Sequence, residues 1–312
     1  MSKIAIFYYT QSGQALQIVQ SICQPLEDAG NTIIYKAIEP ENSFPFPWTC
    51  RSFFEVFPES RLSVPVIKLK KIDFSDVNDA DLVIISGQSW YLSPSLPLHS
   101  FFQDEEVKEY LKEKVIVNIS GCRNMWIMAQ RKIRKYIYEA GGHYVGHIVL
   151  QDKAPNLISV LTIIRWLFFN KKEASRFLPA AGISDDDIKN SARFGITIND
   201  TLETGNWGDL QNKLMQENAV EYKPSIAFIE KTGHRIFGIW ANFIRKKGDY
   251  QDNRRALRIK MFYYYLFFVL YVVSPIGLLV FYLTYPLRIR PINKSKQEMC
   301  YNLSWNDLMK VQ

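Results

Sequence analysis

The feature that most constrains the fold is a hydroxyl-rich turn, Tyr9–Ala15, between an apolar run and an amphipathic segment. The run Ile4–Tyr8 is typical of a buried strand, and the apolar residues of Leu16–Leu26 recur at helical spacing. The turn therefore precedes a helix N-terminus, where free backbone N–H groups and the helix dipole favour an anion. Gly13 permits close approach of a ligand, and the turn has no Lys of the nucleoside-triphosphate pattern. We expect a phosphate monoester here; an ordinary capped turn is the alternative.

Strand-like and helix-like segments alternate through the first half of the chain. The expected strands are 3–9, 32–38, 82–86, 115–120 and 144–150, and the expected helices are 15–29, 97–113 and 126–140. Alternation of this kind predicts an α/β fold with a parallel sheet and helices on both faces. Ligands of such sheets bind beyond the carboxyl ends of the strands, which is where the turn and two later loops are expected.

These three loops resemble those of flavodoxin-like proteins. Thr10-x-Ser12-Gly13-Gln14 resembles the loop that grips the phosphate of FMN, and Gln88–Pro94 resembles the loop that lays aromatic rings against the flavin. Cys122–Trp126 resembles the third flavin-flanking loop. The resemblance covers about residues 1–151 and implies a doubly wound parallel sheet, order 2-1-3-4-5, that binds FMN. The implied FMN-binding residues are Thr10, Gln11, Ser12, Gly13, Gln14, Ala15, Ser89, Trp90, Tyr91, Ser120, Gly121, Cys122 and Trp126. Ala15 departs from the many members that carry a hydroxyl there.

The whole chain also resembles a narrower group, the flavodoxin-like proteins of dialkylresorcinol biosynthesis, described variously as condensing enzymes or aromatases. The similar segments are Phe44–Trp48, Trp90–Ser95, Ser120–Gln130 and Asn156–Val160. The resemblance implies an FMN-dependent oxidoreductase that aromatises a 2,5-dialkyl-cyclohexane-1,3-dione to a dialkylresorcinol. It also implies a ketosynthase and an acyl carrier protein as partners.

Four residues in or near the loops are candidates for the chemistry. Tyr91, His99 and Cys122 are candidate bases, and packing is the alternative role of each. Arg123 is a candidate for steadying an enolate or the reduced flavin, with a surface ion pair as its alternative. A membrane-tethered NAD(P)H:quinone reductase and a tethered electron carrier would use the same loops. The near-neutral first half speaks against a carrier with an acidic docking face.

Charge is unevenly distributed. Residues 1–150 carry 15 Lys and Arg against 16 Asp and Glu, whereas residues 151–312 carry 23 against 15. The basic excess of the second half therefore needs its own explanation. The four cysteines are scattered, which excludes a C-x-x-C metal or redox pair and fits a reducing compartment. We expect no metal site and no nucleic-acid partner.

The longest uncharged stretch is 261–287, and it predicts a membrane segment. Basic residues flank both ends and Ser274-Pro275 interrupts the middle, so a single kinked span and a re-entrant hairpin are both open. Either would anchor the chain at the cytoplasmic face, beside a lipophilic substrate. The expected domains are the FMN-binding domain 1–151, a mostly helical extension 152–260, the membrane segment 261–287 and a basic tail 288–312.

Three further segments allow two interpretations each. The aromatic and proline-rich stretch 40–78 is a packed loop over one end of the sheet or a lid over the flavin. The apolar run 157–169 is a core helix or an in-plane membrane helix. The apolar stripe in 226–244 is a packing face or a membrane-interfacial one.

Overall fold

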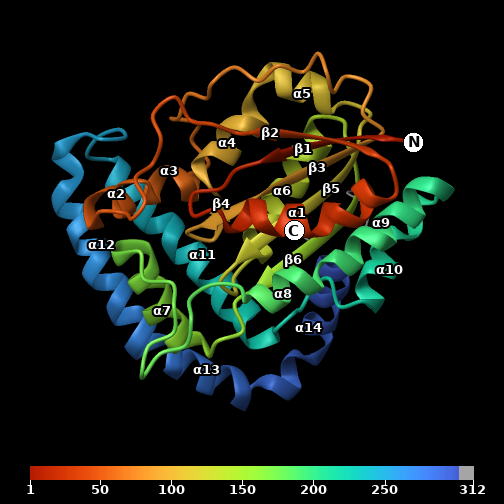
Figure 1. Cartoon of the computed structure of the whole chain (residues 1–312). Coiled ribbons are helices and arrows are strands. Elements are labelled where there is room, and N and C mark those ends of the chain that lie inside the picture. Colours follow the sequence, from red (N-terminus) through yellow and green to blue (C-terminus); the bar gives the residue numbers. More distant parts are fainter. Residues whose placement is uncertain (302–312) are drawn as a thin grey trace.

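A computed structural model describes residues 1–301 of the chain. Its centre is a parallel sheet in the order β2-β1-β3-β5-β6 (Figure 1). The strands are β1 (Lys3–Tyr8), β2 (Thr32–Ala37), β3 (Leu82–Trp90), β5 (Val115–Cys122) and β6 (His143–Gln151). A two-residue strand, β4 (Ser93–Pro94), pairs antiparallel with the end of β3. The five parallel strands follow the flavodoxin-like doubly wound order, so the expected fold class is confirmed.

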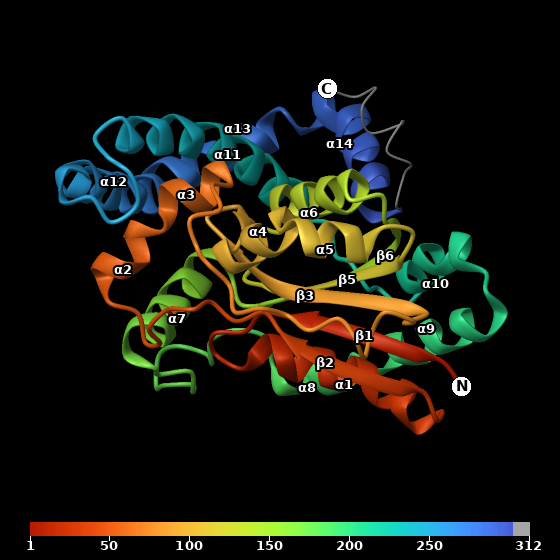
Figure 2. The ribbon, with the colours of Figure 1, turned by 90° about the horizontal axis from the view of Figure 1, so that it is seen from above.

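Helices cover both faces of the sheet, as Figure 2 shows. One layer contains α1 (Gln14–Asp28), α8 (Asp185–Asn190), α9 (Ala192–Thr204), a 3-10 turn η1 (Trp207–Asp209) and α10 (Leu210–Gln216). The other contains α4 (Leu96–Gln103), α5 (Glu105–Leu111) and α6 (Ile127–Glu139). The helix expected over 97–113 is two helices, because Asp104 adopts an extended conformation and caps α5 through a 3.1 Å bond from Val107 N–H.

The core that contains β1 and α1 does not end at residue 151. Ile183, Phe194, Leu214 and Met299 are all buried in it. α9 lies against α1 so closely that a Cβ at Gly195 would be 1.9 Å from the carbonyl oxygen of Ile22. The helices after residue 182 therefore pack into the same core as the sheet. This packing is not evident in the sequence because α9, which covers the sheet, follows a long intervening segment.

The stretch between β2 and β3 contains two short helices, α2 (Cys50–Glu55) and α3 (Phe57–Leu62). Trp48 is buried with Val56 and Leu96 in a small apolar cluster at the carboxyl ends of the strands. The backbone N–H of Trp48 donates to the carbonyl of Leu167 at 2.7 Å. The stretch is thus a packed cover, held to a helix from the second half of the chain.

The remaining helices wrap around one side of the sandwich (Figure 1). They are α7 (Asn156–Phe169), α11 (Pro224–Arg245), α12 (Ala256–Phe268), α13 (Ser274–Leu283) and α14 (Tyr285–Cys300), with a 3-10 turn η2 (Asn253–Arg255) before α12. A π-helical segment, η3 (Val269–Val273), joins α12 to α13 without a reversal. We call residues 256–283 the apolar rod. The expected re-entrant hairpin is wrong, because Pro275 lies in the first turn of α13, where a proline continues a helix.

Within residues 1–301, one helix, Asn253–Leu283, is long and apolar enough to cross a membrane by length and composition. Its most apolar part has a mean hydropathy of 2.4. The start of the expected basic tail is α14, which returns to the core; residues 302–312 lie outside the described part of the chain.

Candidate functional site

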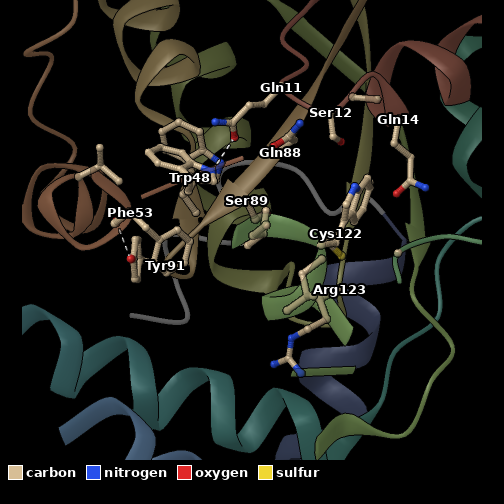
Figure 3. Close-up of a pocket in the computed structure, with 18 of the residues that line it drawn as sticks. Gln11, Ser12, Gln14, Trp48, Phe53, Gln88, Ser89, Tyr91, Cys122 and Arg123 are labelled. Atoms are coloured by element: carbon tan, nitrogen blue, oxygen red, sulfur yellow. Dashed lines mark hydrogen bonds between the residues drawn. The ribbon is translucent and has the colours of Figure 1, made fainter. Parts of the chain in front are cut away.

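A cavity of about 200 Å³ lies at the carboxyl ends of the strands (Figure 3). Its walls come from the turn after β1, the end of β3, the end of β5, the cover between β2 and β3, and α7. Residues from the three predicted loops that line it are Gln11, Ser12, Gln14, Ala15, Gln88, Ser89, Trp90, Tyr91, Gly121, Cys122 and Arg123. The structure thus brings the three loops to one place, as expected for a doubly wound sheet.

The turn after β1 has the features of an anion cradle. Gly13 has a left-handed φ of 85°, precedes the first residue of α1, and has open space where a Cβ would project. The Thr10 hydroxyl oxygen is buried without a hydrogen-bond partner among the described residues. Ser12 lines the cavity, whereas Thr10 and Gly13 do not. An unpartnered hydroxyl beside free N–H groups at a helix N-terminus suits a phosphate oxygen.

The two glutamines of this turn hold neighbouring segments. Gln11 Nε2 donates to the Pro45 carbonyl at 2.9 Å, and Trp48 Nε1 donates to Gln11 Oε1 at 3.0 Å. Gln14 Nε2 donates to the Ile183 carbonyl at 2.9 Å, and Ile183 N–H donates back to Gln14 Oε1 at 3.2 Å. The turn therefore positions both the cover and the segment before α8.

An aromatic wall follows β3. The Trp90 ring is edge-on to the rings of Tyr9, Phe44 and Trp48, with centroids 5.9, 5.0 and 5.3 Å away. Tyr91 has a φ of 51°, which is unfavourable for a bulky residue and is held by tertiary contacts. Its hydroxyl donates to the Phe53 carbonyl at 2.7 Å, and burial raises its pKa well above the ordinary value. Tyr91 is therefore a fixed neutral donor rather than a base.

The third loop supplies the cation of the cavity. Arg123 Nη1 donates to the carbonyl and to Oδ1 of Asn156, each at 2.9 Å. Burial lowers the Arg123 pKa, and the nearby Asp152 carboxylate opposes that effect. Burial, assisted by Glu230, raises the Cys122 pKa, so this thiol stays protonated. Figure 3 shows Cys122 beside the cavity with Arg123 below it.

Three residues expected in the site lie elsewhere. Ser120 is buried in β5 and bonds Asn118 Oδ1 at 3.2 Å, and Trp126 is buried against His147. His99 is fully buried in α4, bonded to Ser93 at 3.1 Å and to the Tyr136 hydroxyl at 2.9 Å. Burial lowers the His99 pKa to about 3, so it is a neutral core residue. The sequence alone does not show whether a histidine on an apolar helix face is a buried core residue or a base in the site.

Several lining residues were not predicted as part of the site. They are Ile18, Trp48, Phe53, Val56, Ile163, Trp166, Leu167 and Gly182. Ile163, Trp166 and Leu167 recur at helical spacing in the run 157–169, which marks one face of a helix but not what it faces. α7 thus contributes an apolar wall that a sheet-based prediction omits.

A second hollow opens beside the first. It is lined by Ser12 and Gln14 and by three cations, Arg165, Lys171 and Lys172. Lys172 is paired with Asp185 at 3.2 Å, and Glu173 is the acidic residue in the lining. The excess of positive charge beside the turn favours an anion there. Within residues 1–301, no group of three His, Cys, Asp or Glu side chains is arranged to hold a metal ion.

Comparisons with known proteins give structural similarity only. No family model and no curated protein matches the chain. It is similar to a flavodoxin from the domain Archaea, with 13% identity and a TM-score of 0.38 over 64% of this chain and 99% of that one. It is also similar to the WrbA-like flavodoxin of Agrobacterium tumefaciens, with 11% identity and a TM-score of 0.39 over 65% and 99%. A flavoprotein in complex with FMN from Lactobacillus acidophilus NCFM has 18% identity and a TM-score of 0.37 over 48% and 93%.

The strand order places three loops at one edge of the sheet, and the first of them forms an anion cradle at the N-terminus of α1. The chain therefore has the flavodoxin-like fold, with its candidate site at the carboxyl ends of β1, β3 and β5.

Proposed function

We propose that this chain binds FMN in the cavity and acts as a flavin-dependent oxidoreductase on a lipophilic ring substrate. The observation that carries the proposal is the turn before α1, where Ser12 lines an aromatic cavity at a glycine-containing helix N-terminus and the nearby Thr10 hydroxyl has no partner among residues 1–301. The similar solved structures include a flavodoxin and a flavoprotein in complex with FMN, which agrees with the proposal.

The residues present fit the cofactor. Thr10, Ser12 and the backbone N–H groups of the turn would hold the phosphate, and Trp90 and Tyr91 would flank the ring. Bound FMN would supply a two-electron acceptor. The cavity of about 200 Å³ is smaller than the roughly 300–1,000 Å³ of common ligand pockets, and the second hollow, which shares Ser12 and Gln14 with it, adds open space beside it.

At the finer level, the proposed substrate is a 2,5-dialkyl-cyclohexane-1,3-dione and the product a dialkylresorcinol. Aromatisation removes two hydrogens from the ring, one as a hydride, for which bound FMN would be the acceptor, and one as a proton from the acidic carbon. Arg123 is the cation of the cavity lining and would stabilise an enolate oxygen. An enolisable dione needs only a weak base, and neither Tyr91 nor Cys122 is assigned that role because burial keeps both protonated.

The partners are proposed from the resemblance to the flavodoxin-like proteins of dialkylresorcinol biosynthesis. A ketosynthase that joins two acyl chains, one delivered by an acyl carrier protein, would supply the dione. The apolar lining of α7, which contains Ile163 and Leu167, suits a substrate with hydrocarbon arms.

The test is anaerobic titration of the FMN-loaded full chain with a dialkyl-cyclohexanedione, followed by the visible spectrum. Stoichiometric bleaching with release of the resorcinol supports the proposal. Arg123→Gln should slow bleaching more than Arg123→Lys, while both keep the flavin. Bleaching by NAD(P)H with electron delivery to a quinone, and none by the dione, would assign the chain to quinone reduction instead.

A further inference from the structure

The apolar rod presents two opposite faces, and both are apolar. One face is buried on the body of the protein at Ile259, Phe262 and Phe281, with the small polar Ser274 between them. The other is exposed and forms a stripe at helical spacing, with exposed fractions from 46% to 73%: Tyr264, Phe268, Val272, Ile276, Leu279 and Leu283. A helix whose free face is this apolar is not an ordinary water-facing helix.

The buried face is held along its length by α11, which runs antiparallel to the rod. Trp240 packs on Tyr265 with centroids 4.9 Å apart, and near the other end of α11 Phe228 packs on Phe281 at 5.4 Å. The buried residues Phe262 and Phe281 are 19 positions apart, or about 28 Å along a helix. The body of the protein is therefore in contact with the rod over a length close to the thickness of the hydrocarbon core of a bilayer.

α11 is in turn fixed to the sandwich by polar contacts. Arg61 of α3 donates to the His234 carbonyl at 2.8 Å, and Glu230 accepts from Met128 N–H of α6 at 2.7 Å. α11 also carries the exposed cations Lys231 and Arg235. If the rod crossed a bilayer, these groups would be drawn to membrane depth, where unpaired charges are costly.

We propose that the rod lies in the plane of an anionic membrane surface, with its exposed stripe in the lipid and the sandwich in water, instead of crossing the bilayer. Two features select a lipid occupant. Cations without an ion-pair partner among residues 1–301 stand at both ends of the stripe: Lys246, Lys247 and Lys260 near one end, and Arg290 and Lys294 near the other. Two exposed tyrosines stand near the ends of the rod, Tyr264 in the stripe and Tyr282 next to its last residue, as interfacial aromatics do.

α7 has an exposed apolar face of its own, next to the cavity. Its exposed residues Leu157, Ile158 and Leu161 are apolar, while Ile163 and Leu167 line the cavity. Arg123 is bonded to Asn156 at the start of α7 and lies within electrostatic range of Tyr271 of the rod, so the start of α7 lies on the rod's side of the cavity. Resting on the proposed function, this arrangement places the dione cavity one helix away from lipid.

The first test is flotation of the purified full chain with preformed vesicles of phosphatidylcholine, with and without phosphatidylglycerol. The wild type should bind, more strongly with the anionic lipid. Phe268→Glu and Ile276→Glu should each lower the bound fraction about tenfold or more, because an apolar contact is replaced by a charge. Ile196→Glu on α9, where the residue is 55% exposed on the opposite layer, is the matched control and should bind normally.

The second test distinguishes lying from crossing. Single cysteines at 268, 276 and 283 are labelled with a fluorophore in a Cys50→Ser background, Cys50 being the exposed native cysteine. Quenching by nitroxide lipids of known depth should report the same shallow depth at all three positions. A deep central position with shallow ends, or a graded series, would overturn the proposal. The proposal would also be overturned if the chain did not bind vesicles and instead formed a homodimer, detected by light scattering, that buries the stripe.

Vesicle binding and flavin chemistry are measured separately. Binding without dione oxidation refutes only the proposed function, and dione oxidation without binding refutes only the membrane surface.

Discussion

Glu230 of α11 accepts a 2.7 Å hydrogen bond from the backbone N–H of Met128 at the start of α6. A carboxylate is favoured at a helix N-terminus, yet burial raises the Glu230 pKa from 4.5 to about 7. One side chain thereby joins α11, which supports the apolar rod, to the loop that contains Cys122.

The shifted pKa of Glu230 predicts a pH dependence. The folded state holds this proton more tightly than the unfolded state, so the contribution is fully present below about pH 4.5 and is lost as pH rises toward 7. Wild type should lose roughly 3 kcal/mol in the free energy of unfolding over this range through this group, and Glu230→Gln should not show that loss. Denaturant unfolding at several pH values checks it, with the exposed Glu109→Gln as control. Parallel pH curves for wild type and Glu230→Gln would contradict the assignment.

Ser12→Asp should abolish FMN co-purification, because a fixed negative charge would face the phosphate in the turn before α1. Gln20→Glu adds the same charge on an exposed position of α1 and should leave flavin content unchanged. The ratio of flavin absorbance to protein absorbance measures both variants. Full occupancy in Ser12→Asp would show that the turn does not hold the phosphate.

Trp90→Ala should weaken FMN binding and shift the flavin spectrum. Aromatic pairs contribute about 0.5–1.5 kcal/mol beyond area burial, which corresponds to a loss of roughly 2–10-fold in affinity. Fluorescence titration of the apoprotein measures the change. Unaltered affinity and spectrum would remove Trp90 from the ring contacts.

Tyr91→Phe should lower the free energy of unfolding by about 1 kcal/mol, because the Phe53 carbonyl loses its 2.7 Å donor. The rate of flavin reduction by substrate should stay the same, since the buried phenol is not a base. A large loss of rate at unchanged stability would instead assign Tyr91 to the chemistry.

Arg255 joins η2, the turn before the apolar rod, to α3 through two bonds to Glu59, at 2.7 and 2.8 Å, and both residues are fully buried. Arg255→Ala should cost about 3–5 kcal/mol, because the Glu59 charge is left buried without this partner. Arg254→Ala, next to it and exposed, should cost less than about 1 kcal/mol. Equal effects of the two substitutions on thermal unfolding would mean that the buried pair does not hold the rod.

The strand order and the three loops were predictable because each loop follows an apolar run that ends at the same sheet edge. The position of α9 was not predictable, because the residues of Ala192–Thr204 do not indicate which helix they pack on. The structure shows that α9 packs on α1, with its closest approach at Gly195. The apolar rod was predictable as a long uncharged helix, but its orientation depends on contacts such as Trp240 with Tyr265, between helices distant in sequence. The role of His99 also depends on contacts with distant residues such as Tyr136, so the sequence could not distinguish it from a histidine in the site.

The return of α14 to the core has a consequence for the order of synthesis. Met299 and Cys300 are fully buried in the same core as β1, and they follow the apolar rod in the chain. A ribosome therefore releases the rod before it releases the residues that finish the packing around the first strand. If the rod binds lipid as proposed, its contact with the membrane and the completion of the fold would be successive events.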